Sequence, residues 1–243
     1  MPDISAIKGI LFDKDGTLLD YARTWVPVNH ELARIAANGD KALARTLLLA
    51  TGMDPDTDEV TPDSLLAAGN TVEIVDGLIA SGSPVPRPVL VDALDRLFAN
   101  TAEFAVPVAD LAAIFASLHK AGYRLGVASS DNENSIRETA RRFGFDGFLD
   151  YVAGYDSGHG VKPEPGMVLG FCERTGLQPH EVAVVGDNNH DLHMGRAAGA
   201  GMTVAVLTGT GSRQSLAAAS DHCLDDITGL FDILRLPQTA VQP

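Results

Sequence analysis

The segment IKGILFDKDGTLL, residues 7–19, ends an apolar run with two carboxylates, Asp13 and Asp15. The apolar residues before them are β-formers, in the pattern of a strand buried on both faces. Gly16 then lets the chain turn, and in an extended segment the two acids point to the same side. Two carboxylates in one small site repel, so one is readily protonated while the other stays ionised. The pair therefore offers one nucleophile and one proton donor.

Polar side chains also follow three later strand-like runs. They are Ser129 after residues 123–128, Lys162 in the loop after residues 149–153, and Asp187, with Asp191 four residues on, after residues 182–186. In an open parallel sheet, ligands bind outside the carboxyl ends of the strands, where the strand order reverses. We therefore expect all these groups on one edge of the sheet.

This set of residue types suits phosphoryl transfer. Asp13 and Asp187 offer the hard oxygen ligands that magnesium prefers, and Lys162 can neutralise phosphate charge. Ser129 and nearby backbone amides can donate hydrogen bonds to phosphate oxygens. Asp13 can attack phosphorus to give an aspartyl-phosphate. Asp15 can protonate the leaving oxygen and later deprotonate the hydrolytic water.

Four segments in this order match a known family: FDKDGT, a Ser after an apolar strand, VKPEP and VVGDNNHD. They resemble the four motifs of the haloacid dehalogenase superfamily, and most closely its phosphatases of the phosphoglycolate phosphatase type. The resemblance implies an α/β fold: a doubly wound, Rossmann-like parallel sheet core with an inserted all-helical cap domain after the first motif. The motif-bearing core covers about two thirds of the chain.

The resemblance also implies roles for individual residues. Asp13 would be the nucleophile and Asp15 the general acid/base. Mg²⁺ would be held by Asp13, the backbone carbonyl of Asp15 and Asp187, with support from Asp191. The phosphate would be bound by Ser129 and Lys162, with the neighbouring Gly16, Thr17 and Ser130 as further candidates.

The elements that must position these residues alternate between strand-like and helix-like segments, which indicates α/β architecture with a mostly parallel sheet. Between residues 19 and 105 the pattern is helical instead, and it predicts a four-helix unit over 28–38, 40–51, 63–80 and 88–103. We therefore predict a core from residues 1–19 and 105–243 and a cap from residues 20–104.

After residue 105 the βα rhythm resumes. It predicts helices over 108–121, 133–143, 165–175, 190–198 and 226–235, and strands over 123–128, 149–153, 182–186, 202–207 and 222–224. The first four of these helices end at or just before a glycine, the residue expected to terminate a helix.

Simpler interpretations stand beside some of these roles. Ser129, Ser130 or Asp131 could cap the helix over 133–143, and Asp191 lies in a helix first turn, where an acid is favourable anyway. Arg23, at the entry to the cap, could pair with a substrate carboxylate or simply be exposed.

Trp25, also at the cap entry, could pack on a leaving group or belong to the cap's core. The chain has Asp20-Tyr21 where the family more often continues with Asp-Ser, which puts phosphoglycolate itself in doubt as the substrate.

Composition limits the other classes of function. The 243 residues are 45% hydrophobic, enough for a core, and the formal charge of −14 argues against nucleic acid or an anionic membrane as partner. Cys172 and Cys223 form no CxxC pair, which favours free thiols in the cytoplasm. We see no signal peptide and no apolar run near the roughly 18 residues of a membrane helix.

The sequence thus predicts a magnesium-dependent phosphatase for a small phosphorylated metabolite, 2-phosphoglycolate-like or a sugar phosphate. A sugar phosphomutase would use the same motifs and differ in its cap. A catalytically idle phosphate-binding regulatory protein on this fold is the alternative outside enzymes. A dehalogenase is disfavoured because Asp15 and the magnesium set suit phosphate.

Overall fold

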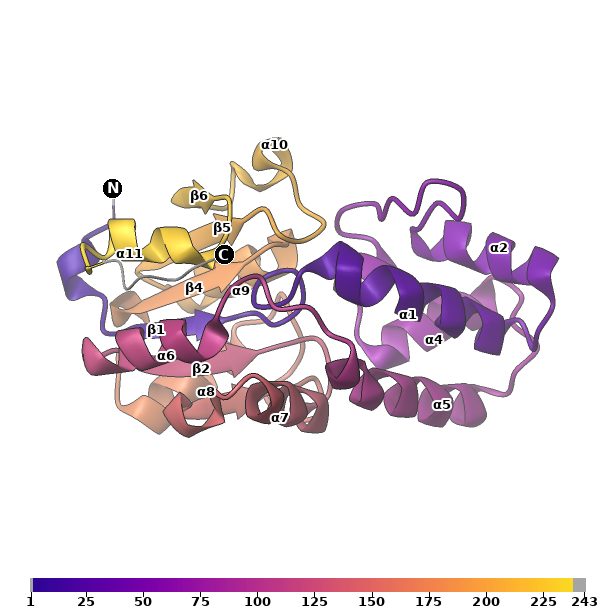
Figure 1. Cartoon of the computed structure of the whole chain (residues 1–243), viewed down its shortest axis with the longest axis horizontal. Coiled ribbons are helices and arrows are strands. Elements are labelled where there is room, and N and C mark those ends of the chain that lie inside the picture. The colour runs from indigo at the N-terminus through magenta and orange to yellow at the C-terminus, as the bar shows by residue number, and fades with distance from the viewer. Residues whose placement is uncertain (1, 238–243) are drawn as a thin grey trace.

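The computed structural model describes residues 2–237. Figure 1 shows an elongated molecule in which a sheet flanked by helices lies beside a group of helices from the first half of the chain.

Six parallel strands form one sheet in the order β3-β2-β1-β4-β5-β6. They are β1 Gly9–Phe12, β2 Arg124–Ala128, β3 Tyr151–Ala153, β4 Val182–Gly186, β5 Met202–Val206 and β6 His222–Leu224. In the register, Gly9 of β1 lies opposite Arg124 on one side and Val182 on the other. The strand order reverses between β1 and β4, so the crevice expected at the switch point lies at their carboxyl ends.

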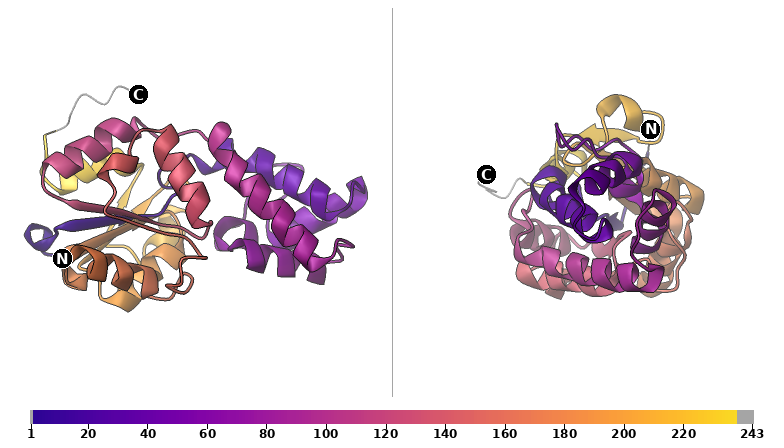
Figure 2. Two further views of the ribbon diagram at one scale, coloured as in Figure 1. Left: turned by 90° about the horizontal axis from the view of Figure 1, so that it is seen from below. Right: turned by 90° about the vertical axis from the view of Figure 1, so that its right-hand side faces the viewer.

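Helices cover both faces of the sheet (Figure 2), which confirms the doubly wound α/β core. They are α6 Leu111–Lys120, α7 Glu133–Arg142, α8 Gly166–Thr175, α9 Asn189–Ala198, α10 Arg213–Leu216 and α11 Leu230–Ile233. In β1, Ile10 and Phe12 pack with α6, α7 and α11 on one face, while Leu11 packs with α8 and α9 on the other. This alternation explains why the strand is apolar throughout.

The segment between Leu19 and Ala105 is helical and has its own hydrophobic cluster, built from residues between Tyr21 and Phe98. Its helices are α1 Tyr21–Ala36, α2 Lys41–Thr51, α3 Leu65–Ala68, α4 Thr71–Ala80 and α5 Arg87–Ala99. We call these five helices and their connecting loops the cap. The limits of residues 20–104 for a separate domain stay a prediction.

Three predicted helices of the cap differ from the structure. The one over 88–103 ends at Ala99 and is followed by a 3₁₀ helix, Asn100–Glu103. The first begins at Tyr21 rather than at residue 28, because the Asp20 side chain caps it by accepting a hydrogen bond from the Arg23 amide at 3.0 Å. The predicted helix over 63–80 is two helices, α3 and α4, because the chain leaves the helix at Gly69 and Asn70 then caps α4 in a reciprocal capping box.

In the core the predicted strand over 182–186 is confirmed to the residue, and Gly176 and Gly199 end their helices in the left-handed conformation, as expected. The predicted helix over 226–235 is only a 3₁₀ turn, Ile227–Gly229, followed by α11. The short helix α10 was not predicted.

Cys172 and Cys223 are both free thiols. Within residues 2–237, none of the helices has the length and apolar character needed to cross a membrane. The expectation of a cytoplasmic location stays a prediction.

Candidate active site

Two carboxylates meet at the switch point of the sheet. The Asp13 amide continues the ladder beyond β1 by donating to the Val185 carbonyl at 2.8 Å, which fixes the start of the turn against β4. Asp187 directly follows β4. Both side chains are buried, so the sheet itself brings together two acids that are more than 170 residues apart in sequence.

Lys162 joins this pair from the loop after β3. Its buried ammonium group donates to Asp13 Oδ1 at 2.5 Å and to Asp191 Oδ1 at 2.6 Å. The other oxygen of Asp191 accepts from the Asn188 amide at 3.2 Å, completing a capping box at the start of α9. Asp191 therefore stabilises the start of α9 and also lies beside Lys162 and Asp13, while its support of a metal ion stays a prediction.

Three carboxylates lie close enough to share a metal ion. One oxygen each of Asp13, Asp187 and Asp191 lies within 4.8 Å of the others. Burial, and then repulsion by Asp191 and Asp13, raises the pKa of Asp187 well above its ordinary value. A buried set of hard, mutually repelling oxygens is the kind of site that a divalent cation such as Mg²⁺ stabilises.

The turn after β1 is shaped around Asp187. A Cβ on Gly16, which has φ +81°, would lie 2.6 Å from the Asp187 carboxylate, and one on Gly209 would lie 1.8 Å from it. The Thr210 amide donates to Asp187 Oδ2 at 2.9 Å. The glycines therefore allow the backbone to approach this carboxylate closely. Thr17 is fully buried nearby, and its hydroxyl has no hydrogen-bond partner among the described residues.

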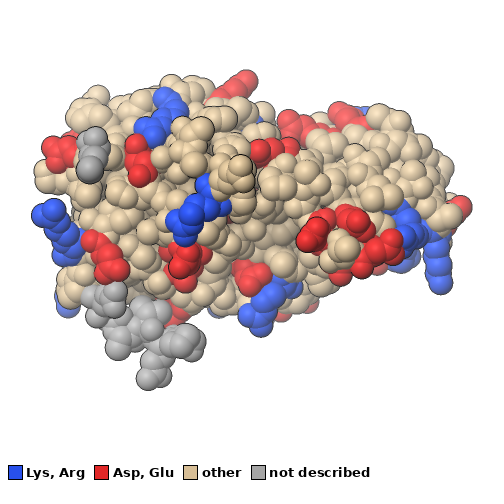
Figure 3. All heavy atoms as spheres, turned by 90° about the horizontal axis from the view of Figure 1, so that it is seen from above, with Lys and Arg blue, Asp and Glu red and all other residues tan. Residues whose placement is uncertain are grey.

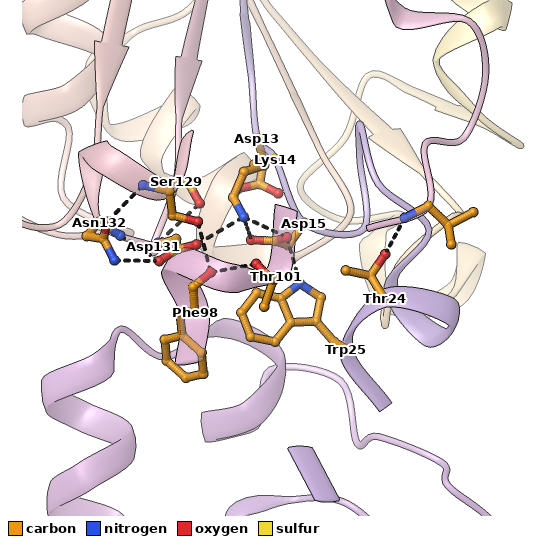
Figure 4. A network of polar contacts seen from close by, with 12 residues as sticks. Asp13, Lys14, Asp15, Thr24, Trp25, Phe98, Thr101, Ser129, Asp131 and Asn132 are labelled. Atoms are coloured by element: carbon orange, nitrogen blue, oxygen red, sulfur yellow. Dashed lines mark hydrogen bonds and ion pairs between the residues drawn. The ribbon is translucent and has the colours of Figure 1, made fainter. Parts of the chain in front are cut away.

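The Asp15 side chain lies between Lys14 and Trp25 (Figure 4). Its carboxylate accepts a hydrogen bond from Trp25 Nε1 at 2.6 Å and pairs with the Lys14 ammonium, which lies 2.8 Å from Oδ2. Lys14 is 1% exposed and also pairs with Asp131 at 3.0 Å. Trp25 comes from α1, so the cap contributes directly to the surroundings of Asp15.

Sequence reasoning missed Lys14 and Asp131. A lysine between the two acids of FDKDGT, inside a segment predicted to be buried, was the available signal, because a buried ammonium needs carboxylate partners.

Burial raises the pKa of Asp13 and of Asp15 to about 6, although Lys162 and Lys14 oppose this shift.

Ser129 lies at the end of β2 and is buried. Its amide donates to the Ala153 carbonyl at 2.9 Å, and its hydroxyl accepts from the Asp131 amide at 3.1 Å. The interpretation that Ser129, Ser130 or Asp131 caps α7 was wrong, because the cap is Asn132, which accepts from the Ser135 amide at 2.9 Å.

These residues line one small cavity of about 40 Å³, here named the catalytic pocket. Its core walls include Asp13, Ser129, Lys162 and Asp187. The end of α3, residues 67–69, closes it from the cap side. Ser130, which is half-buried, also lines it.

Two polar contacts hold the cap against the core beside this pocket. Asn189 Nδ2 donates to Asp63 Oδ2 at 2.8 Å, and Asn188 Nδ2 donates to the Ala67 carbonyl at 3.5 Å. The cap therefore lies closed over the site, an arrangement that can shield reacting groups from water.

Arg23 is not brought to the catalytic pocket. It is exposed and lines a separate groove with residues 57–62 of the cap and 207–210 of the core. On the face drawn in Figure 3, basic and acidic side chains are interspersed and form no continuous basic band. That nucleic acid is not a partner stays a prediction.

The sequence matches the family model of the haloacid dehalogenase-like hydrolases over residues 7–199, most of the chain. The matched segment contains the acids, Ser129 and Lys162 described above.

Two curated relatives have known names. The chain is 26% identical over 193 residues to the N-acetylmuramic acid 6-phosphate phosphatase of Pseudomonas aeruginosa, covering 79% of each chain. It is 31% identical over 116 residues to pyrophosphatase PpaX of Bacillus velezensis, covering 48% of this chain and 54% of the relative. The match thus spans about half the length of the pyrophosphatase.

Solved structures share the fold. A predicted phosphoglycolate phosphatase from Haemophilus somnus superposes with a TM-score of 0.72 at 19% identity, covering 94% of this chain and 98% of that one. CbbY from Rhodobacter sphaeroides, in complex with phosphate, superposes with a TM-score of 0.67 at 22% identity, covering 90% and 94%. The similarity includes the cap as well as the sheet.

Proposed function

The chain belongs to the haloacid dehalogenase-like hydrolases and is a phosphatase of that family; we propose that it hydrolyses small phosphomonoesters through an aspartyl-phosphate on Asp13. The observation that carries the proposal is the position of Asp13, buried at the switch point and 2.5 Å from the Lys162 ammonium. A carboxylate held beside a cation at the end of a buried strand is placed to attack an anionic phosphoryl group.

In the first step the Asp13 carboxylate oxygen forms a bond to phosphorus, and the bond from phosphorus to the leaving oxygen breaks. Asp15 gives its proton to that oxygen. In the second step Asp15 takes a proton from a water molecule whose oxygen attacks phosphorus, which frees Asp13 and inorganic phosphate. A pKa of about 6 suits Asp15 to both roles near neutral pH.

The remaining residues bind the phosphoryl group and its charge. Lys162 and Ser129 both line the catalytic pocket and would donate to phosphate oxygens. Asp13, Asp187 and the backbone carbonyl of Asp15 would hold Mg²⁺, with Asp191 supporting it. When bound, the ion supplies positive charge that offsets both the clustered acids and the phosphate.

The substrate is proposed at the level of a class. The names of the two relatives concern an amino-sugar acid phosphate and pyrophosphate, and a further CbbY structure contains xylulose-1,5-bisphosphate. Small phosphorylated metabolites, either 2-phosphoglycolate-like or sugar phosphates, remain our proposal for this chain.

The deciding experiment is phosphate release from a panel of small phosphomonoesters, with Mg²⁺ and with a chelator. We expect release only with Mg²⁺, and none from Asp13→Asn. Retention of most activity by Asp13→Asn would overturn the mechanism. Isomerised product without phosphate release would favour a sugar phosphomutase instead. A folded, magnesium-loaded sample with neither product would favour an idle binding protein.

A further inference from the structure

A second small cavity lies beside the catalytic pocket, between the cap and the core. It is lined by twelve residues, among them Asp15, Trp25, Asn29, Phe98 and Asp131. We call it the leaving-group pocket. We propose that it accepts a short, neutral, hydroxylated alcohol and rejects a leaving group that carries a second anion. This inference rests on the proposed phosphatase function and narrows its substrate class to the smallest sugar or polyol phosphates, disfavouring 2-phosphoglycolate-like esters.

The position of the cavity gives it this role. Asp15, Ser130, Ala67 and Gly69 line both this cavity and the catalytic pocket. A phosphoryl group beside Lys162 and Ser129 would therefore direct its ester oxygen past Asp15, the proton donor of the proposed mechanism. The rest of the alcohol would then enter the leaving-group pocket.

Charge around the pocket disfavours a second anion. Its lining, taken from the described residues, contains no Lys, Arg or His. The ammonium of Lys14 is already paired with two lining residues, Asp15 and Asp131. Among the described residues that line the pocket, no cation is free to pair with a carboxylate or phosphate on the leaving group, which would be buried there without a counter-charge.

The size of the cavity favours a short alcohol. Its volume is about 50 Å³, and one water needs roughly 10–15 Å³ measured this way, so it has room for about three to five water-sized atoms. Trp25 and Phe98 form an apolar wall, with ring centroids 5.1 Å apart in an edge-on arrangement. A few carbon and oxygen atoms would fill this space with the cap closed.

One polar group in the pocket lacks its full set of partners. Asn29 is 1% exposed, and its amide makes one hydrogen bond among the described residues, from Nδ2 to the Tyr21 hydroxyl at 3.4 Å. That hydroxyl in turn donates to the Leu66 carbonyl at 2.6 Å. A side-chain amide can take part in about four hydrogen bonds, so Asn29 has capacity left for a hydroxyl of the alcohol.

Three esters with leaving groups of similar size test the proposal: 2-hydroxyethyl phosphate, 2-phosphoglycolate and propyl phosphate. They present a hydroxyl, a carboxylate and a methyl group at the same end. In the Mg²⁺-loaded wild type we expect kcat/KM for 2-hydroxyethyl phosphate to exceed that for 2-phosphoglycolate by at least about tenfold. It should exceed that for propyl phosphate by about fivefold to tenfold.

The Asn29→Leu variant separates recognition from general damage. It should lose the preference for 2-hydroxyethyl phosphate over propyl phosphate. The ratio of the two kcat/KM values is the readout, because damage common to both esters cancels in it. If 2-phosphoglycolate proves the better substrate while Asp13→Asn is inactive, the phosphatase function stands and this inference is wrong.

If no ester releases phosphate, the proposed function fails, and binding decides the inference. Calorimetric titration of Asp13→Asn with the same three esters and Mg²⁺ measures the preference without turnover. Tighter binding of 2-hydroxyethyl phosphate than of 2-phosphoglycolate supports the assigned pocket. Equal or reversed affinity overturns it.

Discussion

The indole Nε1 of Trp25 donates a hydrogen bond to Asp15 Oδ1 at 2.6 Å. This bond joins α1 of the cap to the turn after β1, at the carboxylate proposed as the general acid/base (Figure 4). It exists only where the cap lies against the core. The position of the cap and the hydrogen bonding of Asp15 are therefore physically linked.

Trp25→Phe should slow turnover with little loss of stability. Phenylalanine keeps a ring against Phe98 but removes the N–H donor to Asp15. A hydrogen bond to the ionised carboxylate lowers its pKa, so its loss should raise the pKa of Asp15. We expect kcat to fall roughly tenfold and the acid limb of the pH–rate profile to move to higher pH. An unchanged profile with unchanged kcat would show that the bond does not position Asp15.

Lys14→Met should destabilise the fold. The change leaves Asp15 and Asp131 buried near each other without the ammonium that pairs with both. Breaking a buried ion pair by removing one partner costs about 3–5 kcal/mol. Urea denaturation of the metal-free protein measures this loss of unfolding free energy.

The double variant Lys14→Met/Asp131→Asn is the control for that interpretation. Asp131→Asn removes one of the two stranded carboxylates, so the double variant should be more stable than Lys14→Met alone. If the losses of unfolding free energy in Lys14→Met and in Asp131→Asn simply added up in the double variant, Lys14 and Asp131 would not be energetically coupled.

The sequence was sufficient to predict that Asp13, Asp187 and Lys162 lie together, because the carboxyl ends of parallel strands meet at one edge of the sheet. Asp13 and Asp187 follow the adjacent strands β1 and β4, and Lys162 reaches them from the loop after the edge strand β3. Their proposed roles stay predictions. Periodicity was also sufficient for the strands themselves, since β1 and β4 are buried on both faces.

What the sequence did not reveal depends on how the cap sits on the core. The direction of α1 decides whether Trp25 packs in the cap or reaches Asp15. In the structure Trp25 does both, since it belongs to the hydrophobic cluster of the cap and donates a hydrogen bond to Asp15. Arg23, two residues earlier, lies on the opposite side and is exposed. No spacing in the sequence sets that direction, which comes from tertiary packing.

Asp63→Ala should loosen the closed cap. Asp63 accepts from Asn189 across the boundary between cap and core, an exposed contact worth up to about 1 kcal/mol. Trp25 is the sole tryptophan and is 8% exposed in the closed arrangement. Acrylamide quenching of its fluorescence should therefore increase in this variant.

Asp58→Ala is the matched control. Asp58 lies in the same region, also has a positive φ (61° against 60° for Asp63), and pairs with His30 inside the cap. It should lose a similar amount of local stability while leaving the quenching of Trp25 near the wild-type value. Equal quenching in the two variants would argue against a role of Asp63 in closure.

Stability of the metal-free protein should fall as the pH rises through the window set by its buried acids. Folding raises the pKa of Asp13 and of Asp15 from 3.8 to about 6. Between these values the folded chain binds more protons than the unfolded chain, so raising the pH from about 4 to 6 favours unfolding. For Asp13 alone the effect is on the order of 2–3 kcal/mol. Surface acids with lowered pKa values, such as Asp76, act in the opposite direction.

Asp187→Asn separates the contribution of the clustered acids to the pH dependence of stability from the contribution of the surface acids. The variant removes one of three repelling carboxylates, so without metal it should melt above the wild type at pH 7.5 and near it at pH 5. Mg²⁺ binds the ionised acids, so it should raise the wild-type melting temperature more at pH 7.5 than at pH 5. The variant should lose most of this gain. Calorimetry of both proteins at both pH values, with Mg²⁺ and with a chelator, measures these differences. Equal stabilisation by Mg²⁺ in the two proteins would rule out Asp187 as a ligand.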